Sequence, residues 1–394
     1  MDKSEHKYLI LYFACIIAAA FSLRSPITAV GPVVSQIKED LNISSGIAGM
    51  LTTIPVLLFS LTAFFAGAAL PRFRIGVSAL VCLVLTSAGI VIRSYGGIFG
   101  LYAGTVLTGF GIGTLNVMIP SMNREKLPLK VGLVTGVYNV AMNLMAGMGS
   151  GLTYPLSQKF GGWRPAIAIW GIFPLLAIPL WGRLCSLPRF DDKAGESFSP
   201  FESAKKYLNR RVWAIAAVMA LQGFVYYSVV IAWCPTMLTD KGISSELTGG
   251  LTIFMQMVSL IPAFLTPVMA VERRNRTAIA LIGGLSYLTS SILYLTCSSL
   301  PMMIVCCILW GIGSGASFSY VLALITLSGR DKTETTWISG FVQMVGYAAA
   351  AIGPALFGFI VDASGEWTIP MMVIMAVNIL YIAAGIYSGQ SLEN

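Results

Sequence analysis

Twelve apolar segments of about 20 residues follow one another along this chain, and short polar connections separate most of them. An α-helix needs about 20 predominantly apolar residues to cross the hydrocarbon core of a bilayer. The pattern therefore predicts an all-α membrane protein with twelve transmembrane helices. The predicted spans are 8–32, 47–70, 76–94, 98–122, 131–156, 165–185, 212–236, 247–270, 277–297, 301–327, 336–361 and 369–388.

Charged residues make up only 11% of the 394 residues, whereas 56% are hydrophobic. Soluble domains carry roughly 25% charged residues, so this composition excludes a soluble enzyme. The formal net charge of +8 does not indicate a nucleic-acid partner, because the basic residues lie in short loops between apolar segments. Most of the seven cysteines lie inside apolar spans and form no CxxC pair, so we expect no disulfide framework, metal site or cofactor.

The longest polar connection, residues 186–211, predicts a division into two six-helix bundles, 1–185 and 212–394, joined by a cytoplasmic linker. Orientation follows from the positions of Lys and Arg, which favour the cytoplasmic side. With the N-terminus inside, 19 of the 25 Lys and Arg residues lie on the cytoplasmic side and five, including Arg93, lie outside. We expect a multi-pass protein of the cell inner membrane with both termini in the cytoplasm.

The two halves resemble one another. ISSGIAGMLT at 43–52 matches ISSELTGGLT at 243–252 at six of ten positions, and GGW at 161–163 matches GEW at 365–367. The offsets stay between 200 and 204 residues, which indicates a duplication. Six spans in each half give both halves the same orientation. A parallel repeat of this kind predicts a substrate site near the membrane midplane, between the halves.

Arg24 is the one charged residue that the sequence places well inside an apolar run, FACIIAAAFSLRSPITAVGPVV. A guanidinium keeps its proton even when it is buried. Such a charge at the membrane centre costs at least about 2.5–3.5 kcal/mol. No Asp or Glu lies deep in any other predicted span. The sequence therefore favours a passing anion over a fixed carboxylate as the partner of Arg24.

The repeat also selects polar residues that would surround Arg24. Asn139 and Asn143 lie four residues apart and so share one face of a helix. The residues 204 positions later are Gln343 and Tyr347, which form a second i, i+4 polar pair. The residue 203 positions after Arg24 is Tyr227. The alternative is that these groups only hydrogen-bond between helices. The predicted substrate-binding set is Arg24, Asn139, Asn143, Gln222, Tyr226, Tyr227, Gln256, Gln343 and Tyr347.

Two basic turns occupy equivalent places in the halves. Arg72 and Arg74 follow the second span, and Glu272 and Arg273 follow the eighth. These charges either set the topology or form ion pairs between the halves that close the cytoplasmic side. The chain has no Walker loop and no membrane-embedded carboxylate. This argues against an ATP-driven pump and against the usual proton relay.

Specific stretches of the chain carry a family resemblance. They are LRSPITAVGPVV at 23–34, VGLVTGVYN at 131–139 and FVQMVGYAAAAIGPALFGFIVDASGEW at 341–367. The two groups of six helices resemble the major facilitator superfamily, and these stretches resemble its cyanate and 2-nitroimidazole porter family. That family commonly reads LRPAIT, whereas this chain has Ser25 and places its proline at 26. Its loop motif between the second and third spans normally carries an acidic residue, which GAALPRFRIG lacks.

The resemblance implies transport of small anions or export of nitroaromatic compounds, with Arg24 as the residue that contacts the substrate. We expect a monomeric secondary or facilitative transporter for a small polar solute that is cyanate-like, carboxylate or nitro-bearing. Rocker-switch alternating access would move it, with a coupling proton or counter-anion as a further partner. The alternatives are an efflux pump for 2-nitroimidazole-like aromatic drugs, and a channel or receptor that does not transport. We do not expect this protein to be an enzyme, because its sequence contains no pair of residues suited to acid–base catalysis.

Overall fold

The computed structural model describes residues 3–69, 74–127, 131–187, 190, 206–330 and 332–391. Within these residues the chain forms helices and no strand. The elements are α1 Lys3–Thr28, η1 Gly31–Val33, α2 Val34–Leu41, α3 Ser45–Ala69, α4 Ile75–Tyr95, α5 Gly97–Lys126, α6 Val131–Lys159, α7 Trp163–Ala168, η4 Ile169–Gly171, α8 Ile172–Cys185, α10 Arg210–Val225, η5 Tyr226–Trp233, α11 Cys234–Asp240, α12 Ser245–Met269, α13 Arg273–Thr296, α14 Leu300–Ser328, α15 Lys332–Ser364 and α16 Thr368–Gln390.

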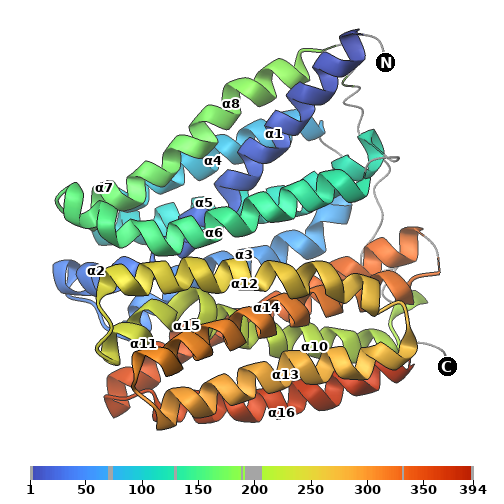
Figure 1. Ribbon diagram of the computed structural model, residues 1–394. Coiled ribbons are helices and arrows are strands. Elements are labelled where there is room, and N and C mark those ends of the chain that lie inside the picture. Colours follow the sequence, from blue (N-terminus) through green and yellow to red (C-terminus); the bar gives the residue numbers. More distant parts are fainter. Residues whose placement is uncertain are drawn as a thin grey trace.

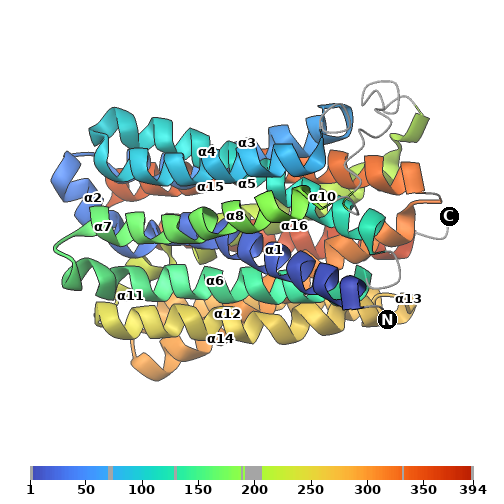
Figure 2. The ribbon, with the colours of Figure 1, turned by 90° about the horizontal axis from the view of Figure 1, so that it is seen from above.

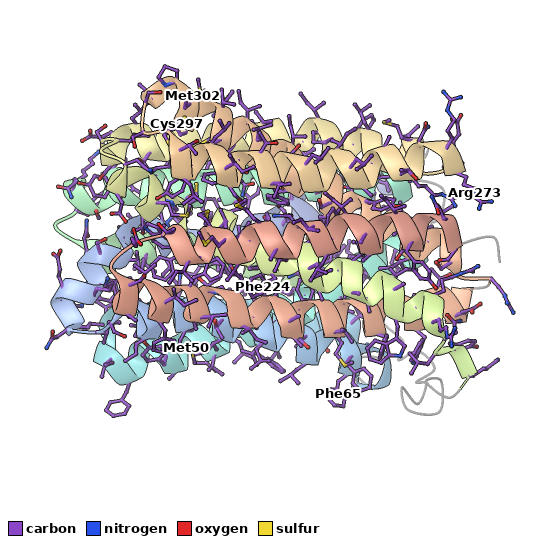
Figure 3. All side chains as sticks on the ribbon, turned by 90° about the horizontal axis from the view of Figure 1, so that it is seen from below. Met50, Phe65, Phe224, Arg273, Cys297 and Met302 are labelled. Carbon is purple, nitrogen blue, oxygen red and sulfur yellow. The ribbon has the colours of Figure 1, made fainter. Side chains whose placement is uncertain are left out.

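The long helices lie side by side along one common direction (Figures 1 and 2). Both chain termini lie at one end of this bundle, which we call the terminal end (Figure 1). The opposite end, which carries α2, α7 and α11, is the far end. Figure 3 places Arg273 at the terminal end and Cys297 and Met302 at the far end, so α13 crosses the whole bundle.

Eleven described stretches are long and apolar enough to cross a membrane, including Lys7–Leu41 and Arg210–Asp240. The 29-residue helix α6 is the remaining helix of spanning length. The prediction of an all-α fold with twelve spans is therefore confirmed. Two spans extend further than predicted. The first continues beyond α1 through η1 into α2, and the seventh runs from α10 through η5 into α11.

Large apolar side chains are exposed along the outside of the bundle. Phe99 is 87% exposed, Phe264 77% and Phe65 47%, and Figure 3 shows Phe65 at the outer edge. In water such a surface would associate, whereas in a bilayer it contacts lipid chains that are equally apolar. The exposed apolar belt thus agrees with helices that span a membrane.

We call α1–α8 the first six-span set and α10–α16 the second six-span set. The main contacts between them are α3 against α15 and α6 against α12. Glycine permits the second contact, since a Cβ on Gly249 would overlap the carbonyl oxygen of Gly151. Residues 188–189 and 191–205 of the predicted linker 186–211 lie outside the described residues, so the division into domains 1–185 and 212–394 stays a prediction.

The repeated ISS motif forms the same local structure twice. The Ser44 Oγ accepts a hydrogen bond from the Ile47 N–H at 3.3 Å, and the Ser244 Oγ accepts one from the Leu247 N–H at 3.3 Å. A side-chain oxygen at this position satisfies one of the N–H groups that a helix start leaves unpaired. The motif therefore begins α3 in the first set and α12 in the second.

The repeated GxW motif also recurs in space. The Trp163 Nε1 donates to the Asp40 carboxylate at 3.1 Å, and the Trp367 Nε1 donates to the Asp240 carboxylate at 2.8 Å. Each bond joins the start of a set's last span to the end of its first span that lies at the far end. The equivalence predicted from GGW and GEW thus extends to the bonds that these residues make.

Both of these first spans depart from regular α-helix near their middle. Pro26 lies inside α1, which ends at Thr28, and η5 is an eight-residue π-helix between α10 and α11. Proline cannot donate the helical hydrogen bond, and π-helical turns leave the standard register. These irregular stretches lie at equivalent places of the repeat and face one another between the two sets, where η1 contacts η5.

Candidate functional site

Arg24 lies at the middle of the first span, Lys7–Leu41, and four residues before the end of α1. Its Nη1 donates to the hydroxyl of Tyr227 in η5 at 3.3 Å. The two residues are 203 apart, the offset that the repeat gives them. The side chain of Arg24 is half-buried, whereas Tyr227 is only 2% exposed. The arginine of the first set and its repeat-equivalent tyrosine therefore meet at the boundary between the sets.

This contact leaves most of the guanidinium free. At 3.3 Å it is longer than a typical N–H···O bond of 2.7–3.2 Å, and a guanidinium has five N–H donors. Within the described residues Tyr227 is the only hydrogen-bond partner of these donors, and no carboxylate is paired with Arg24. The arrangement can accept a planar, negatively charged or oxygen-bearing group on the remaining donors.

Tyrosines surround the guanidinium. Tyr138 of α6, Tyr226 and Tyr227 of η5, and Tyr347 of α15 all lie within electrostatic range of Arg24. We call these four residues the tyrosine cluster. The rings of Tyr226, Tyr227 and Tyr347 pack edge to face: the centroids are 5.2 Å apart for Tyr226–Tyr227 and 6.0 Å for Tyr227–Tyr347. Such packing fixes the hydroxyls in place. The cluster thus gives the arginine polar neighbours that carry no fixed negative charge.

The prediction from sequence missed Tyr138, which is only 3% exposed. Its hydroxyl donates to the Asn116 Oδ1 at 3.3 Å. Its repeat equivalent at an offset of 204 is the apolar Val342, so the symmetry argument passed over it. Tyr138 lies directly before Asn139, in the stretch that carries the family resemblance. This position could have identified it as a candidate site residue.

The other predicted members do not join this cluster through hydrogen bonds. Asn139 is exposed, and the Asn143 Nδ2 donates to its backbone carbonyl at 2.9 Å. The Gln343 Nε2 donates to Ser339 at 2.8 Å. Gln222 and Gln256 are each 2% exposed. Within the described part of the chain none of these five side chains is hydrogen-bonded to Arg24, so their role as substrate ligands stays a prediction.

Three of the residues predicted to gate the cytoplasmic side, Arg74, Glu272 and Arg273, lie at the terminal end. Arg72 lies outside the described residues, and Arg74 is exposed at the start of α4. The Asn275 Nδ2 donates to Glu272 at 3.1 Å, and the Arg273 Nη2 donates to the Gln390 carbonyl at 3.4 Å. Both of these partners belong to the second set. Ion pairs between the sets at this end stay a prediction.

Arg93 is a buried arginine near Arg24, and the prediction from sequence did not single it out. The sequence counted it among the Lys and Arg residues of the outer side, near the end of a span, and made no prediction about its burial. The structure buries Arg93 to 2% exposure in the last turn of α4, where its Nη2 donates to the Pro26 carbonyl at 2.5 Å. Hydropathy could not reveal this, because burial here depends on how α4 packs against α1 and α5.

At the far end the two sets are joined by a carboxylate. Asp362 of α15 accepts hydrogen bonds from the Ser45 N–H at 3.0 Å and the Gly46 N–H at 2.7 Å, at the start of α3. An acidic group at a helix N-terminus binds unpaired N–H groups and interacts favourably with the helix dipole. In Figure 1, α1 and α8 diverge from the second set toward the terminal end. The sets are thus closed against each other at the far end.

An open hollow of about 660 Å³ also lies at the far end, lined by residues that include Asp40, Trp163 and Arg164. Arg164 forms an ion pair with Asp40 at 2.7 Å. None of the predicted substrate-binding residues lines this hollow. Among the described side chains, no group of three His, Cys, Asp or Glu is placed to hold a metal ion.

Comparison with known proteins assigns the fold to a family. The model of the Major Facilitator Superfamily matches residues 12–337. The chain therefore belongs to this superfamily of multi-pass membrane transporters. A solved structure of the same fold is a bacterial homolog of the human lysosomal transporter Spinster in an inward-facing and unoccupied conformation. Its TM-score is 0.75 at 16% identity, and the alignment covers 100% of this chain and 98% of that one.

Three bacterial relatives match nearly the whole chain. The uncharacterized transporter YycB of Bacillus subtilis (strain 168) is 35% identical over 378 residues, 95% of this chain and 92% of the relative. The 2-nitroimidazole transporter of Escherichia coli (strain K12) is 30% identical over 390 residues, covering 98% and 97%. The cyanate transport protein CynX of the same organism is 24% identical over 359 residues, covering 89% and 90%. The resemblance inferred from the sequence is confirmed.

Proposed function

We propose that this protein carries a small planar solute, anionic or nitro-bearing, across the cytoplasmic membrane by alternating access, with Arg24 as the residue that binds it. The observation that supports this most is the Arg24–Tyr227 contact at 3.3 Å. It joins the two six-span sets at the middle of the first span, where a parallel repeat is expected to bind its substrate. Both termini lie in the cytoplasm, and the protein acts as a monomer.

The charge of Arg24 suits transient binding. At an effective dielectric constant of about 20, a unit anion 4 Å from the guanidinium gains about 4 kcal/mol. Desolvation of the anion and of the arginine offsets much of this gain. The balance gives binding that is weak enough for release on the other side. The planar fork fits two oxygens of a carboxylate or nitro group better than the point charge of a lysine would.

The names of two relatives agree with such a substrate, since one transports 2-nitroimidazole and the other cyanate. The described spans place no paired carboxylate beside Arg24 that could relay a proton. The solute therefore moves together with a proton that it carries, or in exchange for a counter-anion. The third alternative is facilitated transport, in which no second solute is coupled.

A second candidate function is efflux of uncharged aromatic drugs related to 2-nitroimidazole. The edge-to-face rings of Tyr226, Tyr227 and Tyr347 favour it, because they present flat apolar surface beside the arginine. Competition separates the two proposals. Inhibition of 2-nitroimidazole transport by cyanate or small carboxylates supports the anion site, whereas inhibition only by neutral aromatics supports the drug pump.

The test is counterflow of labelled cyanate and of 2-nitroimidazole in proteoliposomes. We expect Arg24→Ala and Arg24→Lys to lose at least about 90% of transport, since each removes the bidentate fork. The matched control is Arg164→Ala, which removes a half-exposed arginine paired with Asp40 at the far end. Wild-type transport by folded Arg24→Ala protein, judged by its melting temperature, would refute the proposal.

A further inference from the structure

Arg93 is a buried arginine to which the proposed transport cycle assigns no role. It lies in the last turn of α4 with 2% of its surface exposed, and its Nε has no hydrogen-bond partner among the described residues. Burying a cation is costly unless it is paired or hydrogen-bonded. Its described hydrogen bond runs from Nη2 to the Pro26 carbonyl at 2.5 Å. This bond is the contact that offsets the burial.

The Pro26 carbonyl is available because α1 ends at Thr28, two residues later. In a continuous helix the N–H four residues later, on Val30, would donate to it. Here the Val30 N–H donates to the Ile27 carbonyl at 3.4 Å, and the Ala29 N–H donates to the Ser25 carbonyl at 3.0 Å. The carbonyl of Pro26 is thus left without a helical donor at the C-terminal end of a helix. A cation is favoured there, both as a hydrogen-bond donor and by the helix dipole.

Arg93 itself is held on a rigid support. A Cβ added to Gly104 of α5 would overlap the backbone of Arg93 and the carbonyl of Gly89, so α4 and α5 touch backbone to backbone there. Arg93 therefore connects this close helix pair to the residue that lies two positions beyond Arg24. If α1 shifted or unwound at Pro26, Arg24 would move away from Tyr227.

The second six-span set contains a parallel feature. Tyr294 of α13 lies 201 residues after Arg93, and its hydroxyl donates to the Met237 carbonyl in α11 at 3.2 Å. In both sets a side chain from the third span thus donates to a backbone carbonyl of the irregular first span. The acceptors differ in place: Pro26 lies near the end of α1, whereas Met237 lies in α11, four residues beyond the π-helix η5.

We infer that Arg93 is a positioning residue of the transport site: its guanidinium holds the broken end of α1 through the Pro26 carbonyl and so keeps Arg24 against Tyr227. This inference rests on the proposed role of Arg24. Arg93 does not contact the solute, so its loss changes how well the solute binds more than how fast the sets exchange.

The test measures KM and maximal rate of 2-nitroimidazole and cyanate counterflow for wild type, Arg93→Met and Arg93→Lys. We expect Arg93→Met to raise KM about tenfold with less than about twofold change in maximal rate. Tenfold corresponds to about 1.4 kcal/mol, near the lower end for a hydrogen bond to a charged group. Arg93→Lys keeps a cationic donor, so it should recover most of the affinity.

The matched control is Arg276→Met. Arg276 is also buried, at 6% exposure, and donates to the carbonyls of Ala270 and Gly389 at the terminal end. Its loss should lower the melting temperature without changing KM. Wild-type KM in folded Arg93→Met, or an equal rise in the control, overturns the inference. If Arg93→Met does not fold, Arg93→Gln, which keeps an uncharged donor, takes its place under the same criteria.

A double-mutant cycle separates this inference from the proposed function. If Arg93 acts through Arg24, Arg93→Met adds little loss of affinity in an Arg24→Ala background, whereas additive losses overturn the inference. If Arg24→Ala alone leaves KM unchanged, the proposed function fails instead. Hydrogen exchange of the Ala29 and Val30 amides then tests Arg93 independently: faster exchange in Arg93→Met supports the hold on α1, and unchanged exchange refutes it.

Discussion

Removal of the Asp362 carboxylate should weaken the closure of the far end. This side chain accepts hydrogen bonds from the Ser45 and Gly46 N–H groups at 3.0 and 2.7 Å, across the boundary between the six-span sets. The start of α3 and the end of α15 lie so close together that a Cβ on Gly358 would overlap the backbone of Ser45. The proposed alternating access requires this end to separate. Asp362→Ala therefore removes bonds that exist only while the far end is closed.

The size of the effect follows from the two bonds. Hydrogen bonds to a charged group contribute about 1.5–3 kcal/mol each, and water screening at an exposed carboxylate lowers this to about 1 kcal/mol. Asp362 is exposed, so the pair contributes about 2 kcal/mol to closure. That free energy is about a 30-fold change in the ratio of open to closed molecules. An open state populated at about 1% would rise to about a fifth of the molecules.

Double electron–electron resonance can measure this population. Spin labels at Glu39 in α2 and Ser299 before α14 report the separation of the two sets at the far end, in a background without the seven cysteines. Asp362→Ala should show a second, longer distance that is rare in wild type. Glu366→Ala is the control, since it removes a carboxylate from the same end without a described bond between the sets. Identical distance distributions in Asp362→Ala and wild type would refute the reasoning.

Two further predictions concern packing and the repeat. Gly249→Ala should lower the melting temperature, since its Cβ would overlap the backbone of α6 and overpacking costs about 1–3 kcal/mol. Gly250→Ala is the control and should leave the melting temperature unchanged, because nothing lies within 4 Å of its Cβ. Equal melting temperatures would contradict the close crossing of α6 and α12. Trp163→Phe and Trp367→Phe should each lose about 1 kcal/mol of stability with the bond to their aspartate. A loss in only one of them, measured by thermal unfolding, would speak against equivalent roles in the two sets.

The sequence alone determined the class of fold, because the hydrocarbon core of a bilayer offers the backbone no hydrogen-bond partners. Each apolar run of spanning length must satisfy its own backbone hydrogen bonds, so its length and spacing specify a helix. The repeat made Arg24 and Tyr227 equivalent, and equivalent positions near the axis that relates two halves come together, as these two do. This argument needed no side-chain detail, and for that reason it succeeded.

Only the tertiary structure decided which polar side chains meet. The i, i+4 spacing of Asn139 and Asn143 shows that they share a face of α6, but the rotation of that helix brings Tyr138 toward Arg24 instead. From sequence Arg93 is only a charge near the end of a span, whereas in the structure it donates to the Pro26 carbonyl near the end of α1. Asp362 meets Ser45 across 317 residues of chain. Local sequence encodes which helices form, whereas these contacts depend on how distant helices rotate and approach, which no single segment specifies.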